Sequence, residues 1–180
     1  MNNFKNNSVM GFTLIELLMV IAIIGITTSI AVPSFQSLIA SNRLTTWSNN
    51  LLTAMQLAKS ESIKTNRLVI VSSVIVSSNI TGDWKNGWVV SYKGSTEPTI
   101  SSFEAIKAGY TVKNTFVNSI TYRPDGRIAE NASYRFYFCT PANLADFRSV
   151  FIEPTGRVRV ETPKTESSTP PKTYATACSI

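Results

Sequence analysis

Residues 10–25 read MGFTLIELLMVIAIIG, an apolar run with a single charged residue, Glu16. An ionised side chain inside a membrane-spanning helix costs about 3 kcal/mol on insertion scales, so such a group normally has a partner. If the chain is cut after Gly11, the new α-amino group of Phe12 is one candidate. Within one helix the amine and Glu16 are badly placed for pairing, whereas a neighbouring copy, staggered along a shared axis, could offer its amine. The stretch therefore points to a helix that assembles with others.

The apolar run continues beyond this stretch. From Phe12 to Val32 the only charge is Glu16, and the next charged residue is Arg43. A helix of this length spans about 31 Å, close to the hydrocarbon thickness of a bilayer. Pro33 removes one backbone donor and should bend the helix without ending it. Small and hydroxyl residues let helices pack closely and hydrogen-bond between stems, or are merely tolerated in a lone anchor; here they are Gly25, Thr27, Thr28 and Ser29.

After Pro33 the pattern becomes amphipathic. Apolar residues recur at spacings of three and four, as in a helix with one buried face: Leu44, Trp47, Leu51, Met55 and Ala58. The polar positions include Asn42, Ser48, Asn49, Lys59 and Glu61. We predict one helix over residues 12–65, whose first half faces lipid or neighbours and whose second half covers a globular sheet. A heptad coiled coil is the alternative, although the run is short for one.

The rest of the chain is typical of a β-rich head. β-branched and aromatic runs separated by turn residues predict strands, at residues 68–71, 74–76, on both sides of Asn86-Gly87 within 83–90, and at 110–117, 119–123, 134–138, 150–153 and 157–160. In the aromatic run, Tyr134, Phe136 and Phe138 share one face. Asn86-Gly87, Pro124-Asp125-Gly126 and Pro154-Thr155-Gly156 are turn signals, and residues 161–173 are expected to form an extended surface loop. We expect an α+β fold in which a predominantly antiparallel sheet set packs on the long helix.

The start of the chain resembles the class III signal of type IV pilins and pseudopilins. The matching residues are Gly11 before the cut, Phe12 as first mature residue, Glu16 five positions into the mature chain, and Pro33 at the helix bend. The resemblance implies that a prepilin peptidase removes the leader and methylates the amine of Phe12. The alternative is an ordinary signal anchor or a Sec signal peptide. A Sec signal would carry its cleavage site after the apolar core, and Lys5 is the only charge in this leader.

This resemblance implies four segments and a location. Residues 1–11 are the leader, 12–40 the transmembrane and assembly helix, 41–66 the amphipathic continuation of that helix, and 67–180 the periplasmic or extracellular head. The protein is expected to span the bacterial inner membrane once, with its head in the periplasm, and then to join a pilus or pseudopilus at the cell surface. Its expected partners are the major pilin and other minor pilins.

The two cysteines, Cys139 and Cys178, both lie late in the chain. In an oxidising periplasm they are expected to form a disulfide bond, with two unpaired thiols as the alternative. In the chain-entropy model, closing a loop of this size contributes about 4 kcal/mol. Two cysteines without histidine or CxxC spacing do not favour a zinc site, so we expect no metal.

No catalytic signature is evident. The chain has no histidine, which excludes Ser-His-Asp and Cys-His catalysis. No Walker or GxGxxG motif occurs, and scattered acids such as Asp83, Asp125 and Asp146 show no pairing in the sequence. We therefore expect a protein that is not an enzyme and that has neither a cofactor nor a small-molecule substrate.

The run Gly156-Arg157-Val158-Arg159 is the strongest candidate for a binding site. Strand alternation would put Arg157 and Arg159 on one face, about 7 Å apart, a spacing suited to successive backbone phosphates of duplex DNA. Lys164 and Lys172 could extend the patch, and the formal net charge is +6. The alternative is a solvated strand face on which Glu153 or Glu161 offsets each arginine, and Glu161 and Glu166 dilute the positive field.

The late GRxR strand, together with the aromatic strand that ends in Cys139, resembles the GspH/FimT class of minor pilins and pseudopilins. The Pro-rich stretch before a terminal cysteine is similar to FimU-type members, which are low-copy tip or priming subunits of pili. Some FimT-type members bind extracellular DNA through arginines that would map to Arg157 and Arg159. The tail of this chain is longer and more acidic than a DNA-binding member would need, which favours a structural subunit. The resemblance therefore implies a minor type IV pilin. The alternatives are a DNA-binding minor pilin for natural transformation and a minor pseudopilin of type II secretion.

Overall fold

The structure is a computed structural model that describes residues 12–74, 83–94, 96, 98–114, 117–141, 146–162 and 178. The expected leader with Gly11, the two lysines Lys164 and Lys172, and most of the strand expected at residues 74–76 lie outside the described residues. Within the chain there are two compact units, Met1–Ile39 and Ala40–Ile180, and each is described by itself below.

Helix α1 spans Leu14–Thr65 and continues through Pro33, which confirms the single long helix. It ends where Asn66 adopts a left-handed backbone with φ of 53°, a conformation that asparagine tolerates after a helix. In the first unit the side chains of the helix are almost all exposed. An 18-residue stretch of α1 has a mean hydropathy of 2.4, and none of its residues is buried. This helix is therefore long and apolar enough to cross a membrane.

In the second unit, α1 buries one face against the head. Its buried residues are Ala40, Leu44, Ser48, Leu51, Ala54, Met55, Ala58 and Ser62. The predicted apolar face is confirmed, with Trp47 half-buried at its edge and packed edge-on against Tyr110 at 4.8 Å. The assignment of Ser48 to the polar face was wrong. Ser48 follows Leu44 by four positions and precedes Leu51 by three, which puts it in the middle of the buried stripe.

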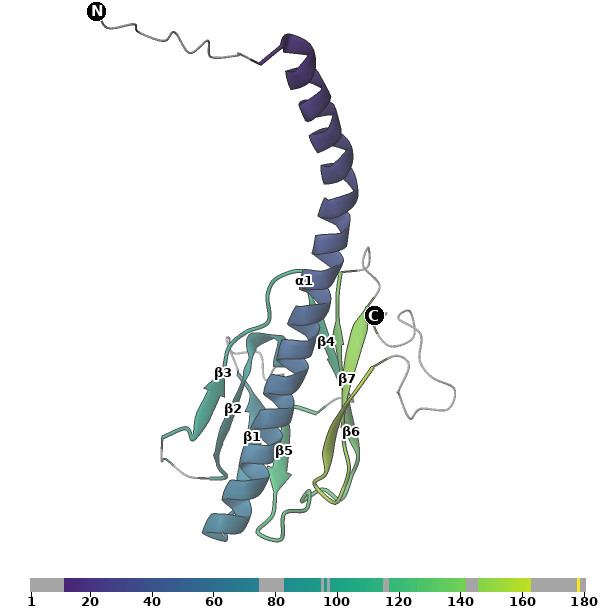
Figure 1. The fold of residues 1–180 in the computed structure, drawn as a ribbon. Coiled ribbons are helices and arrows are strands. Elements are labelled where there is room, and N and C mark those ends of the chain that lie inside the picture. Colours follow the sequence, from purple (N-terminus) through teal and green to yellow (C-terminus); the bar gives the residue numbers. More distant parts are fainter. Residues whose placement is uncertain are drawn as a thin grey trace, which may run out of the picture. The chain divides into compact units, whose positions relative to one another are not determined.

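Two four-stranded antiparallel sheets form the rest of the head (Figure 1). The first has the order β3-β2-β1-β5, with the strands β1 Val69–Ser73, β2 Trp88–Tyr92, β3 Ser101–Phe103 and β5 Ser119–Tyr122. The second has the order β4-β6-β7-β8, with the strands β4 Thr111–Asn114, β6 Tyr134–Cys139, β7 Phe147–Ile152 and β8 Val158–Glu161. The expected α+β arrangement is therefore present.

Both sheets and the helix share one hydrophobic core. Tyr134, Phe136 and Phe138 of β6 all face it, as the alternation predicted. Trp84 packs edge-on against Phe136 with ring centres 4.7 Å apart, and Trp88 of β2 contacts Phe138 at 6.2 Å. The contact between Trp88 and Phe138 joins the two sheets across the core.

One turn signal has a different role from the one expected. Asn86-Gly87 does not connect two strands. It ends the 3-10 helix η1 Trp84–Asn86, whose first turn is capped by the side chain of Asp83 accepting from the Lys85 N–H. Local capping by an aspartate competes with strand formation, which explains why the residues before Gly87 are helical.

Candidate functional site

The amino end of α1 is capped by its own side chains. The N–H of Glu16 donates to Thr13 Oγ1 at 3.3 Å, and the N–H of Leu17 donates to the Thr13 carbonyl at 3.2 Å. Thr13 and Glu16 have the three-residue spacing of a capping box, in which a carboxylate also suits the positive end of the helix dipole. The sequence interpretation of Glu16 missed this local role, although the Thr-x-x-Glu spacing is visible in the sequence.

The hydroxyl residues of the stem bond to their own helix. Thr27 Oγ1 donates to the Ile23 carbonyl at 2.9 Å, Thr28 Oγ1 to the Ile24 carbonyl at 2.8 Å, and Ser29 Oγ to the Ile26 carbonyl at 2.7 Å. Such back-bonding satisfies these donors within one helix. They need no neighbouring stem for hydrogen bonding, and their small size is what suits them to close packing.

Arg159 belongs to a charge cluster on the face of the second sheet that points away from the core. We call it the Arg–Glu cluster, formed by Arg135, Phe151, Glu153, Arg159 and Glu161. Phe151 lies between its register partners Arg135 and Arg159, whose guanidinium carbons are 4.4 and 4.6 Å from the ring centre. Glu161 accepts from Arg135 and, at 2.7 Å, from Arg159 Nε. Glu153 is a second carboxylate partner of Arg159.

The surroundings of Arg157 and Arg159 differ. Arg159 is half-buried, and the hydrogen bond that it donates to Glu161 is the main cause that raises the pKa of its guanidinium. Two carboxylates balance the two guanidinium groups of the Arg–Glu cluster. Arg157 precedes β8 and is exposed, and it has no ion pair among the described residues. For Arg159 the alternative interpretation holds, because Glu153, across the turn, and Glu161, on its own strand, offset its charge, whereas no described acid offsets Arg157.

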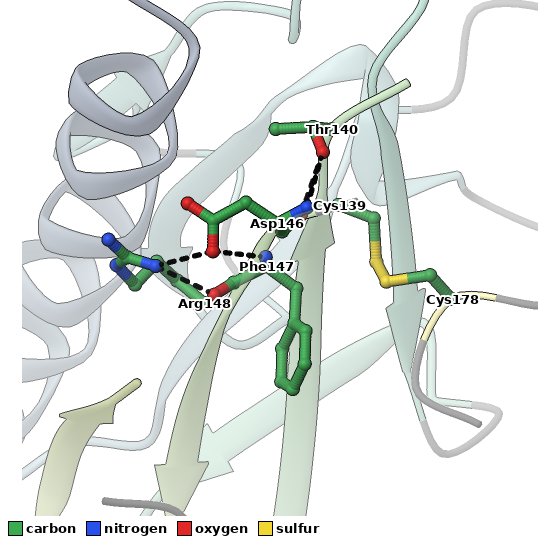
Figure 2. The surroundings of a disulfide bond; sticks show 6 residues. All are labelled: Cys139, Thr140, Asp146, Phe147, Arg148 and Cys178. Carbon is green, nitrogen blue, oxygen red and sulfur yellow. Dashed lines mark hydrogen bonds and ion pairs between the residues drawn. A yellow bond between two sulfur atoms is a disulfide. The ribbon is translucent and has the colours of Figure 1, made fainter. Parts of the chain in front are cut away.

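A disulfide bond between Cys139 and Cys178 closes the other end of this face (Figure 2). This confirms the pairing expected from the sequence. Cys139, Tyr137 and Phe147 form a second small buried cluster, against which Cys178 packs. The disulfide therefore holds Cys178 on the outer face of β6 and β7.

Beside the disulfide, a polar network ties β7 to α1. The Asp146 carboxylate accepts from the Phe147 N–H at 2.9 Å and from Arg148 Nη1 at 3.0 Å, as Figure 2 shows. Arg148 Nη2 reaches Ser41 Oγ at 3.0 Å. Arg148 was not among the residues predicted to be functional from the sequence. In the structure, Arg148 is a charged residue at a core-facing position of β7, where it pairs with Phe138 of β6.

The glycine of the GRVR run has a packing role. Gly156 has φ of +75°, and a Cβ at this position would lie 2.1 Å from the carbonyl oxygen of Gly126. Only glycine allows two backbones to approach so closely. Among the residues that the structure describes, no group of three or more His, Cys, Asp or Glu side chains could hold a metal ion.

A long helix whose second half carries two antiparallel sheets is a pilin-like α+β fold. The chain belongs to the GspH family, since the family model described as "Type II transport protein GspH" matches residues 48–156, more than half of its length.

Solved structures with a similar fold include the type IV minor pilin FimU of Pseudomonas aeruginosa in two crystal forms. Their TM-scores are 0.56 and 0.55 at 21% and 20% identity, covering 67% and 66% of this chain and 90% and 92% of FimU. The minor pseudopilin EpsH of the Vibrio cholerae type 2 secretion system has a TM-score of 0.49 at 9% identity, covering 67% and 98% of the two chains. At 20–21% identity the likeness to FimU concerns the fold alone. A sequence comparison with curated proteins finds no match.

Proposed function

We propose that the protein is a minor type IV pilin, a structural, non-enzymatic subunit that acts in low copy at the pilus tip or in priming assembly. The observation that carries the proposal is α1 itself. In one uninterrupted helix, the amino-terminal half is apolar and unburied, and the second half contributes buried residues to the core of the head. A helix with so much exposed apolar surface needs a membrane or neighbouring helices to cover it.

In this proposal, cleavage after Gly11 frees the amine of Phe12, which is then methylated. Glu16 neutralises the Phe12 amine of a neighbouring subunit and so helps to set the register between stems, while Pro33 shapes the helix for packing. The capping contact with Thr13 supports this role, because it orders the first turn around Glu16. A side chain carried by an ordered backbone loses less conformational freedom when it meets its partner.

The proposal is tested by deleting the gene and restoring it as wild type, Gly11→Ala or Glu16→Ala. We expect the wild-type chain in sheared pili at low copy, with Phe12 as the amino-terminal residue in mass spectrometry. Gly11→Ala should keep the leader, whereas Glu16→Ala should be processed and yet be absent from the fibre. Glu130→Ala, which removes an exposed acid of the head, is the matched control and should assemble normally.

The same strains distinguish the alternative role as a type II secretion pseudopilin. If deletion leaves pili intact but stops the export of secreted enzymes, the protein belongs to the secretion machine and the pilus assignment fails. A mature chain that begins at any residue other than Phe12 would contradict the processing step.

DNA binding for natural transformation is a further alternative, through Arg157 and Arg159 with Lys164 and Lys172. The described residues weigh against it, since Arg159 is already bonded to two carboxylates and duplex binding depends on unneutralised cations along a phosphate track. Of the two arginines, only Arg157 is an exposed cation without an ion pair among the described residues.

A further inference from the structure

The chain contains one short pattern twice, Arg-Pro-Asp-Gly-Arg at residues 123–127 and Glu-Pro-Thr-Gly-Arg at 153–157. We call these segments the twin turns. In both, the glycine N–H donates to the carbonyl of the first residue at 2.8 Å, and the N–H of the first residue donates to the carbonyl of the last at 2.9 Å. The two glycines have φ values of +76° and +75°. The twin turns thus have the same backbone structure.

The twin turns also touch each other. A Cβ on Gly156 would be 2.1 Å from the Gly126 carbonyl oxygen, and the Ile128 N–H donates to the Pro154 carbonyl at 3.0 Å. Helix α1 supports the pair, since Lys59 Nζ donates to the Thr155 carbonyl at 3.3 Å. Both glycines are buried. The backbone that carries the last residue of each turn is therefore held in place by several contacts.

That last residue is an exposed arginine in each turn, Arg127 and Arg157. Neither side chain has an ion pair or hydrogen bond among the described residues. The other described arginines from Arg67 onward have partners: Arg67 lies over the Tyr92 ring, and Arg123, Arg135, Arg148 and Arg159 pair with carboxylates. The fold thus brings together two turns that each present an unpaired guanidinium group.

We propose that the twin turns form a docking site for an acidic segment of another protein chain, with Arg127 and Arg157 as its two contacts. Guanidinium groups bind carboxylates in a bidentate geometry, and a rigid backbone lowers the entropy lost on binding. The inference rests on the proposed function, because the chain that carries the acidic segment would be another subunit of the fibre.

Charge at the site favours a short acidic segment over duplex DNA. Each twin turn carries its own carboxylate, Asp125 with 43% of its side chain exposed and Glu153 with 27%. A duplex presents phosphates continuously and would meet these acids. A segment with a few carboxylates can contact the two arginines and leave the acids at its sides.

The test measures binding to the full-length protein in detergent micelles. The probes are a fluorescent hexaglutamate peptide, a hexaglutamine peptide and a short DNA duplex. We expect Arg127→Gln with Arg157→Gln to weaken hexaglutamate binding about tenfold. The matched control is Lys93→Gln with Lys107→Gln, which removes the same charge from exposed lysines outside the twin turns. The control should change binding less than about twofold.

Three outcomes would overturn the proposal. The control pair could weaken binding as much as the arginine pair, which would indicate net charge alone. Hexaglutamate could fail to bind better than hexaglutamine. The duplex could bind more tightly than the peptide and lose as much with the arginine pair, which would assign the site to DNA. Unchanged thermal unfolding of each variant shows that the fold is kept. Because the binding assay uses no fibre, a negative result would contradict the docking site without contradicting the role in pilus assembly.

Discussion

Arg159 and Arg157 show how much the function of one residue depends on its neighbours across a sheet. One intervening position separates them, but Arg159 stacks on Phe151 and bonds to Glu153 and Glu161. Because a paired guanidinium would have to give up these bonds to bind a phosphate, its charge is not available at low cost. Of these two arginines, Arg157 is therefore the one whose charge is available to bind an anionic partner.

Ser48 is a second residue whose chemistry depends on its surroundings. Its hydroxyl is fully buried and has no hydrogen-bond partner among the described residues. Ser62 on the same helix is equally buried, but it donates to the Lys59 carbonyl at 2.8 Å. An unpaired buried hydroxyl destabilises the folded state, whereas a bonded one does not.

We therefore expect Ser48→Ala to raise the free energy of unfolding by about 1 kcal/mol, through loss of the unpaired hydroxyl and better helix propensity. Ser62→Ala, the control, should be close to neutral because it also removes a hydrogen bond. Denaturant unfolding of both variants in the same detergent checks this. A Ser48→Ala protein less stable than the wild type would show that the hydroxyl has a partner in solution.

At the scale of elements, the β7–β8 turn is a structural junction. It contacts the turn at residues 123–127, and Lys59 of α1 donates to its Thr155 carbonyl. Gly156 is therefore required at this position because the β7–β8 turn packs against the turn at residues 123–127. Its presence in the GRVR run is explained by packing, independently of any ligand.

Gly156→Ala should lower the free energy of unfolding by about 3 kcal/mol or more, because the new Cβ adds a backbone clash to the strain of a positive φ. Gly94→Ala is the matched control, since Gly94 has φ of +71° but nothing within 4 Å of the added Cβ. It should lose only about 1 kcal/mol. Equal losses in thermal and denaturant unfolding would mean that the close approach to Gly126 is not costly.

At the scale of the whole head, the disulfide connects the last described residue to the second sheet. Cys139 is completely buried, and the bond joins positions 39 apart in sequence. Tyr137 and Phe147 pack around it on the face opposite the main core. Among the described residues, α1 and the first sheet pack on one face of β6, and Cys178 packs on the other.

Replacing both cysteines by serine should lower the free energy of unfolding by about 4 kcal/mol, because the unfolded chain loses the constraint of a closed loop. Adding a reductant to the wild type should give the same loss in thermal unfolding. The double variant should not respond to the reductant, which controls for other effects of the reagent. A wild type whose unfolding is insensitive to reductant would contradict a stabilising role for Cys139–Cys178.

Much of the fold could be predicted because it follows local periodicity. The helix, its buried face through Leu44, Leu51 and Met55, and the inward face of β6 all result from spacings of 3.6 and 2 residues. The disulfide was expected from the compartment and from the two cysteines. Ser48 was misassigned because residue type was given more weight than position in the stripe.

The sequence by itself determined the long apolar helix, its amphipathic continuation and the β-rich head, since these depend on residues close together in the chain. Only the tertiary structure decided which strands pair, which arginine is neutralised and which turns touch. Arg159 is neutralised by Glu153 across the β7–β8 turn and by Glu161, a carboxylate that it shares with Arg135 of β6, and the twin turns meet across 30 positions of sequence. Such contacts are set by the packing of the whole head, and no local pattern encodes them.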